Sequence, residues 1–232
     1  MTTFRETTTI CCVCGNNVAH PVLLSTNSLG SPDLDLRQAG MARNTMSLWV
    51  TSCPSCGYVN YDISKADLGE KKLLSIINSK SYKTCDNLEL PNDLAKDFYK
   101  QYLLDKAAKD NQFTFSSLRN CAWVCDDCKA KEMAKKIRLL AIPYLEEIVK
   151  DLGKKDDKLM LADYYRRTEQ FDRTINYLSN LKFSEERLNQ VANYEIYLAK
   201  QKDCKCHTVD GSCLFEIETN LKFLKIFQII LP

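Results

Sequence analysis

The sequence predicts an α+β fold, in which a small N-terminal β region precedes an all-α array of helices. Residues 1–62 are rich in Thr, Ser, Asn, Gly and Pro and contain short apolar alternations, which are typical of strands and turns. After residue 63, apolar side chains recur with the spacing of amphipathic helices. The chain has 232 residues, enough for two such parts. The predicted domains are 1–62, 63–220 and a short apolar tail, 221–232.

Local signals place the individual elements. Strands are predicted at 18–26, 47–52 and 58–62, and helices at 64–78, from 92 onward, and at 116–127, 130–152, 157–168, 171–181 and 185–202. Ser64 or Asp67 is expected to cap the first helix, and Asn92 or Asp93 the second. Pro143 is expected to kink or split the helix at 130–152.

Two Cys-x-x-Cys-Gly motifs lie in the β region: Cys11-Cys12-Val13-Cys14-Gly15 and Cys53-Pro54-Ser55-Cys56-Gly57. The two-residue gap lets both thiolates of a motif turn toward one ion, and the glycine accepts the positive φ that completes the turn. Two motifs supply four sulfurs, which satisfy tetrahedral zinc with no open position. The sequence therefore predicts a zinc ribbon over residues 1–62, with one structural zinc held by Cys11, Cys14, Cys53 and Cys56.

Two alternatives to zinc stay open for these cysteines. Four thiolates also hold iron in iron–sulfur centres. In the second alternative, the cysteines bind no metal and are unligated or redox-active. Cys12 breaks the two-residue spacing and is expected to be a spare packed thiol. If zinc is bound, its loss is expected to destabilise the ribbon and to leave the helices folded.

The later helices look paired. One stretch resembles a tetratricopeptide repeat, in which a small residue lets two helices approach and aromatic side chains fill the groove. It comprises Leu161-Ala162-Asp163-Tyr164-Tyr165, Glu169-Gln170-Phe171-Asp172, Ile175, Leu178 and Leu181. The resemblance covers one repeat, with Thr174 where alanine is usual. An ordinary antiparallel helix pair is the alternative.

Several further segments carry a resemblance to a known family: Ser31-Pro32-Asp33-Leu34-Asp35-Leu36-Arg37, Trp49-Val50, Ala122-Trp123-Val124-Cys125-Asp126-Asp127 and His207-Thr208-Val209. With the two knuckles, they resemble a bacterial family of uncharacterised proteins that carries a domain of unknown function. In that family two Cys-Pro-x-Cys-Gly-type zinc knuckles precede tetratricopeptide-like helices. The resemblance extends to about His207, and Cys12 stands where proline is common. It implies a fold and supplies no catalytic residues.

The chain has twelve cysteines, and some of those outside the ribbon are candidate ligands of a second metal site. Cys125 and Cys128, with Cys204 and either Cys206 or His207, would supply four ligands. The favoured interpretation is packing, because Cys125 and Cys128 lie late in a predicted helix and small buried cysteines suit helix contacts. A redox pair is disfavoured by the same position, since such pairs occupy helix N-termini.

Composition narrows the functional classes. A net charge of +2 and a ribbon without lysine disfavour nucleic-acid binding, which requires a basic face. Only two histidines are present, and no phosphate-binding loop or nucleophile motif appears, so an enzyme is not expected. A polar N-terminus and the lack of a long apolar run predict a cytoplasmic protein without a transmembrane segment. The leading prediction is a protein-interaction or scaffolding module, with nucleic-acid binding as the alternative.

The sequence leaves alternative roles for two segments. Residues 31–43 are charged and rich in turns, so they form either a contact loop or a self-contained loop in which Asp33, Asp35, Arg37 and Arg43 pair. The apolar tail at 221–232 is expected to cover an apolar face of the helices. A loose end, or contact with a membrane surface or a partner, is the alternative.

Overall fold

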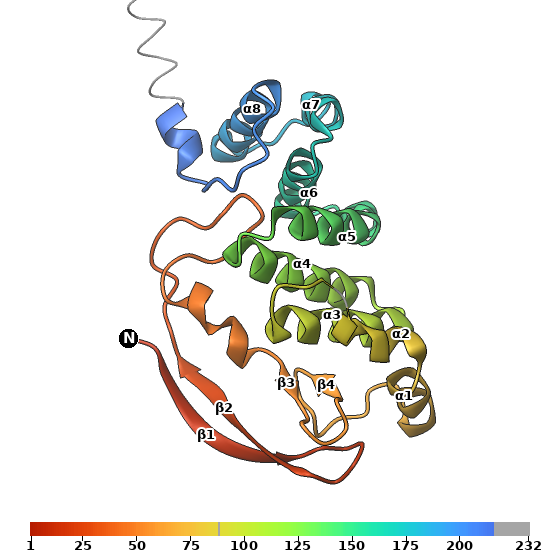
Figure 1. Ribbon diagram of the computed structural model, residues 1–232. Helices are drawn as coiled ribbons and strands as arrows, with labels where there is room; N and C mark the ends of the chain where they lie inside the picture. The colour runs from red at the N-terminus through yellow and green to blue at the C-terminus, as the bar shows by residue number, and fades with distance from the viewer. Residues whose placement is uncertain (88, 216–232) are drawn as a thin grey trace, which may run out of the picture. The chain divides into compact units, whose positions relative to one another are not determined.

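A computed structural model describes residues 1–87 and 89–215 of the chain and confirms the α+β class (Figure 1). The chain divides into two compact units. The first comprises Met1–Leu29 and Gly40–Asp151, and the second comprises Gly30–Ala39 and the chain from Leu152 onward. These two compact units do not coincide with the predicted domains 1–62 and 63–220. That the predicted domains fold independently stays a prediction.

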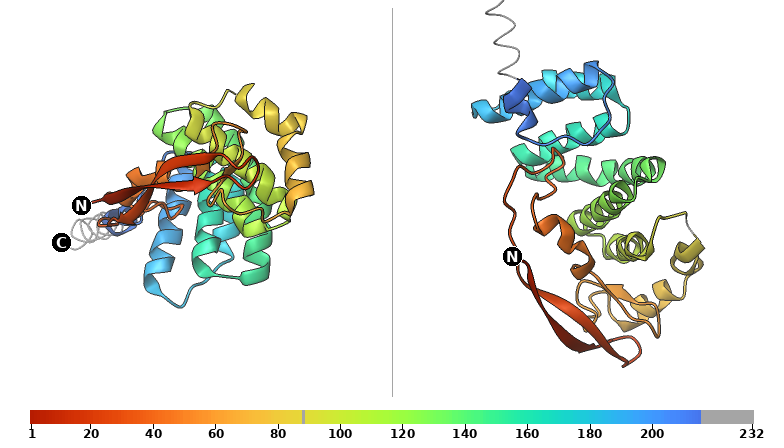
Figure 2. Two further views of the ribbon diagram at one scale, coloured as in Figure 1. Left: turned by 90° about the horizontal axis from the view of Figure 1, so that it is seen from below. Right: turned by 60° about the vertical axis from the view of Figure 1, so that its left-hand side comes forward.

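The β part of the first unit consists of two separate two-stranded antiparallel sheets. Strand β1 (Thr3–Ile10) pairs with β2 (Asn17–Ser25) in a long hairpin, seen in red in Figures 1 and 2. The short strands β3 (Thr51–Ser52) and β4 (Val59–Asn60) form the second sheet. Strand β1 was not predicted, because it is mostly exposed and lacks an apolar alternation.

The strand predicted at 47–52 is largely wrong. A 3-10 helix, η1 (Ala42–Leu48), takes its first residues, and only β3 remains extended. The Thr45 side chain explains this conformation. Its hydroxyl donates to the Ala42 carbonyl (2.8 Å) and accepts from Trp49 Nε1 (3.0 Å), so side-chain bonds hold the turn closed.

The helices of the first unit are α1 (Glu70–Ile77), α2 (Lys80–Lys83), η2 (Thr84–Asn87), α3 (Asp93–Ala108), α4 (Asn111–Asp127) and α5 (Lys131–Leu152). Asn92 caps α3 as predicted, since its Oδ1 accepts from the Ala95 N–H at 2.9 Å. The predicted cap of α1 is wrong, because that helix begins after Gly69 rather than after Ser64 or Asp67.

Helix α5 continues through Pro143 as one element, so of the predicted kink or split, the split is wrong. Pro143 is exposed, and Leu139, whose carbonyl loses its helical partner, is 45% exposed. Water can therefore satisfy that carbonyl on the solvent side. Gly153 follows the helix with φ 62°, the left-handed conformation expected at a helix end.

The second unit contains α6 (Lys155–Arg167), α7 (Phe171–Ser179) and α8 (Glu186–Lys200), which pack against one another. Ala162 and Thr174 are fully buried where α6 approaches α7, and Thr174 Oγ1 donates to the Ala162 carbonyl at 3.3 Å. This is the helical hairpin that the paired pattern predicted. Its assignment as a tetratricopeptide repeat stays a prediction.

The apolar tail predicted at 221–232 lies outside the described residues. Within residues 1–87 and 89–215, no helix combines the length and apolar character needed to cross a membrane.

Candidate metal centre

Two knuckles of nearly identical backbone build the site. In the first, Cys11 N–H donates to the Asn16 carbonyl and Gly15 N–H to the Cys11 carbonyl, both at 2.9 Å. The second repeats this pattern, with Cys53 N–H bonded to Tyr58 (2.8 Å) and Gly57 N–H to Cys53 (2.9 Å). The first knuckle closes the β1–β2 hairpin, and the second lies between β3 and β4.

The knuckle glycines have φ values of 71° at Gly15 and 72° at Gly57. This left-handed conformation is easily adopted only by glycine among the common residues. The sequence therefore fixes the turn that aims both sulfurs of each knuckle to one side.

The four predicted ligand sulfurs, those of Cys11, Cys14, Cys53 and Cys56, all lie within 4.8 Å of one another. Two pairs that join the knuckles are closer: Cys11 Sγ to Cys56 Sγ is 3.7 Å, and Cys14 Sγ to Cys53 Sγ is 3.6 Å. Tetrahedral zinc with Zn–S bonds of about 2.3 Å requires sulfurs about 3.8 Å apart. The donor set and its spacing are thus compatible with a metal ion, and the thiolate chemistry fits zinc.

The site is half embedded in the protein. Cys11 and Cys53 are buried, Cys56 is partly buried and Cys14 is exposed. The buried cysteines belong to an apolar cluster with residues of the ribbon and of the helices that follow it: Val18, Tyr58, Ile63, Leu73, Ile77, Tyr82 and Leu104. The ligands therefore share one core with α1, α2 and α3.

The thiols differ in acidity. Burial raises the pKa of Cys53, but the backbone N–H groups of Cys56 and Ser55 and the Cys14 side chain outweigh it and lower the pKa to about 7. Burial raises the pKa values of Cys11 and Cys56. The second knuckle thus presents backbone N–H groups to Cys53 that stabilise a thiolate.

Cys12 lies outside the four-sulfur group. Its thiol donates to the Lys65 carbonyl at 3.2 Å, and its side chain packs against the apolar cluster. This placement agrees with the expected spare packed thiol.

Within the described part of the chain, the four ribbon cysteines are the only group of three or more candidate metal ligands. Cys125 lies against Cys121 of α4, and Cys128 accepts from Asn92 Nδ2 at 3.3 Å. His207 is engaged by Tyr194 (3.2 Å) and Asp203 (3.1 Å). Cys125 and Cys128 belong to the first unit and Cys204, Cys206 and His207 to the second, so the second site considered for these residues stays a prediction.

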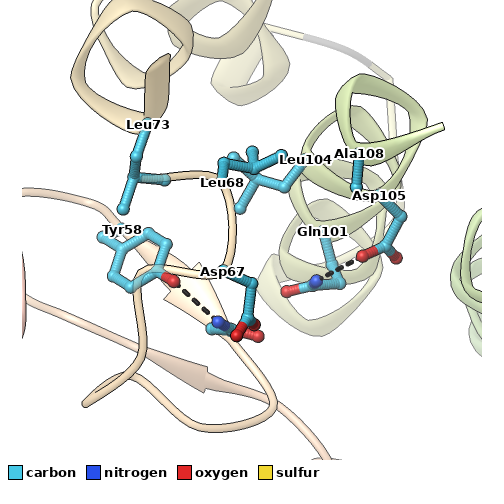
Figure 3. Close-up of a pocket in the computed structure, with 9 residues that line it drawn as sticks. Tyr58, Asp67, Leu68, Leu73, Gln101, Leu104, Asp105 and Ala108 are labelled. Atoms are coloured by element: carbon cyan, nitrogen blue, oxygen red, sulfur yellow. Dashed lines mark hydrogen bonds between the residues drawn. The ribbon is translucent and has the colours of Figure 1, made fainter. Parts of the chain in front are cut away.

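A small cavity of about 40 Å³ lies beside the second knuckle, between β4 and α3 (Figure 3). Tyr58 OH accepts from Asn60 Nδ2 at 2.6 Å, and Gln101 Nε2 donates to Asp105 Oδ1 at 2.8 Å. The space suits about one water molecule. Its polar lining consists of Tyr58, Asn60, Asp67, Gln101 and Asp105.

Comparisons with protein family models, with curated proteins and with solved structures found no match. The family resemblance drawn from the knuckles and the later segments accordingly stays a prediction. The four-sulfur geometry is the observation from which function is argued.

Proposed function

We propose that this chain is a zinc-binding protein, with one structural zinc in its N-terminal ribbon, that acts as a protein-interaction or scaffolding module. The observation that carries the proposal is the convergence of four cysteine sulfurs within 4.8 Å from two matched knuckles. The metal would be held by Cys11, Cys14, Cys53 and Cys56.

The chemistry of the ligands favours a structural role. Four thiolates fill the tetrahedral coordination of zinc and leave no position for water or substrate. A compartment that keeps thiols reduced, such as the cytoplasm, suits such a site. The proposal therefore assigns no catalytic role to the metal.

Interaction with another protein is the function that the rest of the molecule supports best. Residues 1–62 carry three arginines, four acidic residues and no lysine, which gives the ribbon no basic face for phosphates. Stacked helical hairpins, in contrast, commonly present surfaces to peptides and partner helices.

Metal analysis of purified protein tests the zinc site. We expect about one zinc per chain in protein prepared without chelator, and no visible absorbance of an iron–sulfur centre. Cys56→Ser should lose the metal. Cys12→Ser is the matched control, because Cys12 neighbours a ligand but lies outside the four-sulfur group, and it should retain the metal. Metal-free wild-type protein, or equal loss in both variants, would contradict the proposed site.

Affinity capture from native lysate, with and without nuclease, tests the interaction role. A protein partner retained after nuclease treatment is expected. Capture that disappears with nuclease, together with binding to DNA or RNA that weakens steeply with salt, would favour the nucleic-acid alternative instead.

A further inference from the structure

A short N-terminal segment belongs to the second unit. Residues Gly30–Ala39 leave the first unit's chain after Leu29 and return to it at Gly40. Their backbone pairs with the chain that follows α8: Leu34 N–H donates to the His207 carbonyl and Val209 N–H to the Pro32 carbonyl, both at 2.9 Å. Asp33 and Thr208 form an antiparallel bridge. The segment is thus paired with residues 207–209 through main-chain hydrogen bonds and one antiparallel bridge, the type of backbone pairing that extended peptides use.

The Leu34 side chain is the apolar anchor of the segment. It is 2% exposed and belongs to the core cluster of the second unit. Its companions come from all three helices: Leu159, Ala162, Leu178, Val191, Ala192, Tyr194 and Leu198. Burial of Leu34 removes its apolar surface from water and fixes the segment on the three helices.

The next residue supplies a charge contact. Asp35 is 1% exposed, and its Oδ2 lies 3.3 Å from Nη1 of Arg167 at the end of α6. The Arg167 side chain is itself 8% exposed, so the pair is shielded from water. The loop predicted at 31–43 did not include this contact with α6, and the pairing predicted within the segment stays a prediction.

The two ends of the segment also lie close together. Gly30 has φ 115°, and a Cβ placed on it would lie 3.1 Å from the Ala39 Cβ. Gly40 has φ 63°, and a Cβ there would lie 2.7 Å from the Leu29 carbonyl oxygen. The ends therefore meet at two glycines, as in compact loops that behave as separate packing units.

From these contacts we infer that the second unit carries a peptide-binding site, which residues 31–37 occupy as a tethered competitor. The ligand class is an extended peptide of a partner protein with a leucine followed by an acidic residue. The leucine enters the apolar cluster, the carboxylate meets Arg167, and the peptide backbone pairs with residues 207–209. This inference rests on the protein-interaction role proposed above and names the ligand chemistry for it.

The partner is inferred from complementarity of charge and shape. Arg167 presents a guanidinium near the apolar cluster that holds Leu34 and the backbone of residues 207–209, which together recognise three properties of one peptide. A tethered competitor has a high effective concentration, so a free peptide binds measurably only when the tethered segment is weakened.

The probe is a fluorescently labelled peptide with the sequence of residues 30–40, measured by fluorescence anisotropy against full-length chain. The receptor is a variant that combines Leu34→Ser with Asp35→Ser, which weakens its own segment and leaves the site intact. We expect saturable binding to this variant and binding at least about tenfold weaker to the wild-type chain. A peptide carrying Leu34→Ser should bind at least about tenfold more weakly, because burial of the leucine is lost.

A charge reversal provides the specific control. Peptide with Asp35→Lys should bind poorly to the receptor variant and regain binding when the receptor also carries Arg167→Glu. If the double substitution unfolds the second unit, as judged by circular dichroism, Asp35→Asn alone weakens the segment while Leu34 stays packed. Absence of peptide binding to a folded receptor variant would overturn the inference. A wild-type dimer that Leu34→Ser abolishes would also overturn it, because a second copy would then be the occupant.

Failure of this inference is separable from failure of the proposed function. A captured partner that still binds the Arg167→Glu chain would reject the peptide site and leave the interaction role standing. Peptide binding without any captured partner would leave the site standing and count against the interaction role.

Discussion

At the scale of single residues, the knuckle glycines are constrained by backbone conformation and not by space. A Cβ on Gly57 would meet no atom within 4 Å, yet the residue has φ 72°. We expect Gly57→Ala to lower the free energy of unfolding by about 1–2 kcal/mol, the cost of a left-handed conformation for an L-residue. Gly57→Asn should cost less, because asparagine tolerates this region better. Chemical denaturation with measurement of bound metal checks both.

Gly69 is a matched control for that prediction. It has φ 74° and an equally open Cβ position, but it lies before α1 and outside the knuckles. Gly69 has ψ 146°, a combination that is essentially restricted to glycine, so Gly69→Ala should cost at least as much stability and leave metal affinity unchanged. Equal loss of metal affinity in the two alanine variants would contradict a specific role for the knuckle turn.

Glu195 of α8 is a buried acid whose burial is only partly compensated by the nearby Arg166 charge. It is fully buried, and neither carboxylate oxygen has a hydrogen-bond partner among the described residues. Arg166 donates instead to Asp163, at 2.5 Å. Burial and the neighbouring Asp163 raise the pKa of Glu195 well above its ordinary value of 4.5. The folded chain therefore holds a proton there after the unfolded chain has released it.

The sign of the pH dependence follows from that raised pKa. Above pH 4.5 the unfolded state ionises and gains solvation, so stability falls as the pH rises toward the folded-state pKa. Glu195→Gln should remove this loss, and Glu195→Met should raise the free energy of unfolding at neutral pH by about 1–3 kcal/mol. Thermal unfolding from pH 5 to 8 measures both. Glu186→Gln, at the exposed start of the same helix, should keep the wild-type profile.

Sequence spacing predicted the four cysteines that the structure brings together, because each knuckle is a local structure. Cys11 and Cys14 need only a turn between them. The same turn is found at Cys53, which lies 42 positions after Cys11. The Asp35–Arg167 contact joins residues 132 positions apart. No local pattern in either segment marks the other, so this contact was not predictable without the fold.

At the scale of elements, helix α5 contains a proline, which we expect to lower the free energy of unfolding. Pro143 removes one backbone hydrogen bond on the exposed face. Pro143→Ala should restore that bond and raise the free energy of unfolding by about 1–3 kcal/mol. Urea denaturation checks this value, with Glu147→Ala, one turn later on the exposed face, as a control of small effect. A destabilised Pro143→Ala chain would show that contacts of the ring outweigh the missing bond.

Helices were predicted better than strands for a physical reason. Helix signals are local, and the predicted cap Asn92 begins α3. The start predicted at 116 for the next helix is wrong, because Asp110 caps α4 by accepting from the Gln112 and Phe113 N–H groups, so α4 begins at Asn111. The partner of a strand is elsewhere in the chain. Strand β1 is recognised only when its pairing with β2 is known, because its own side chains carry no apolar alternation.

At the scale of the whole molecule, the boundary predicted at residue 62 crosses a shared core. The ribbon cysteines Cys11 and Cys53 belong to one apolar cluster with Leu73 and Ile77 of α1 and Leu104 of α3. The second unit has a separate cluster, built from α6, α7, α8 and Leu34. The effect of metal loss on the helices should therefore follow the compact units and not the predicted domain boundary.

Removal of the metal from the loaded protein tests this arrangement. Structural zinc contributes about 10–16 kcal/mol of apparent binding free energy in small domains, which is comparable to the whole stability of a typical protein, about 5–15 kcal/mol. After chelation we expect faster backbone hydrogen exchange in both knuckles and also in α1 and α3, since their side chains pack on the ligands. Exchange in α6–α8 should stay unchanged, and added zinc should restore protection. Faster exchange in the knuckles alone would show that the helices do not depend on the metal. Equal acceleration across both units would show that the chain unfolds as a single cooperative structure.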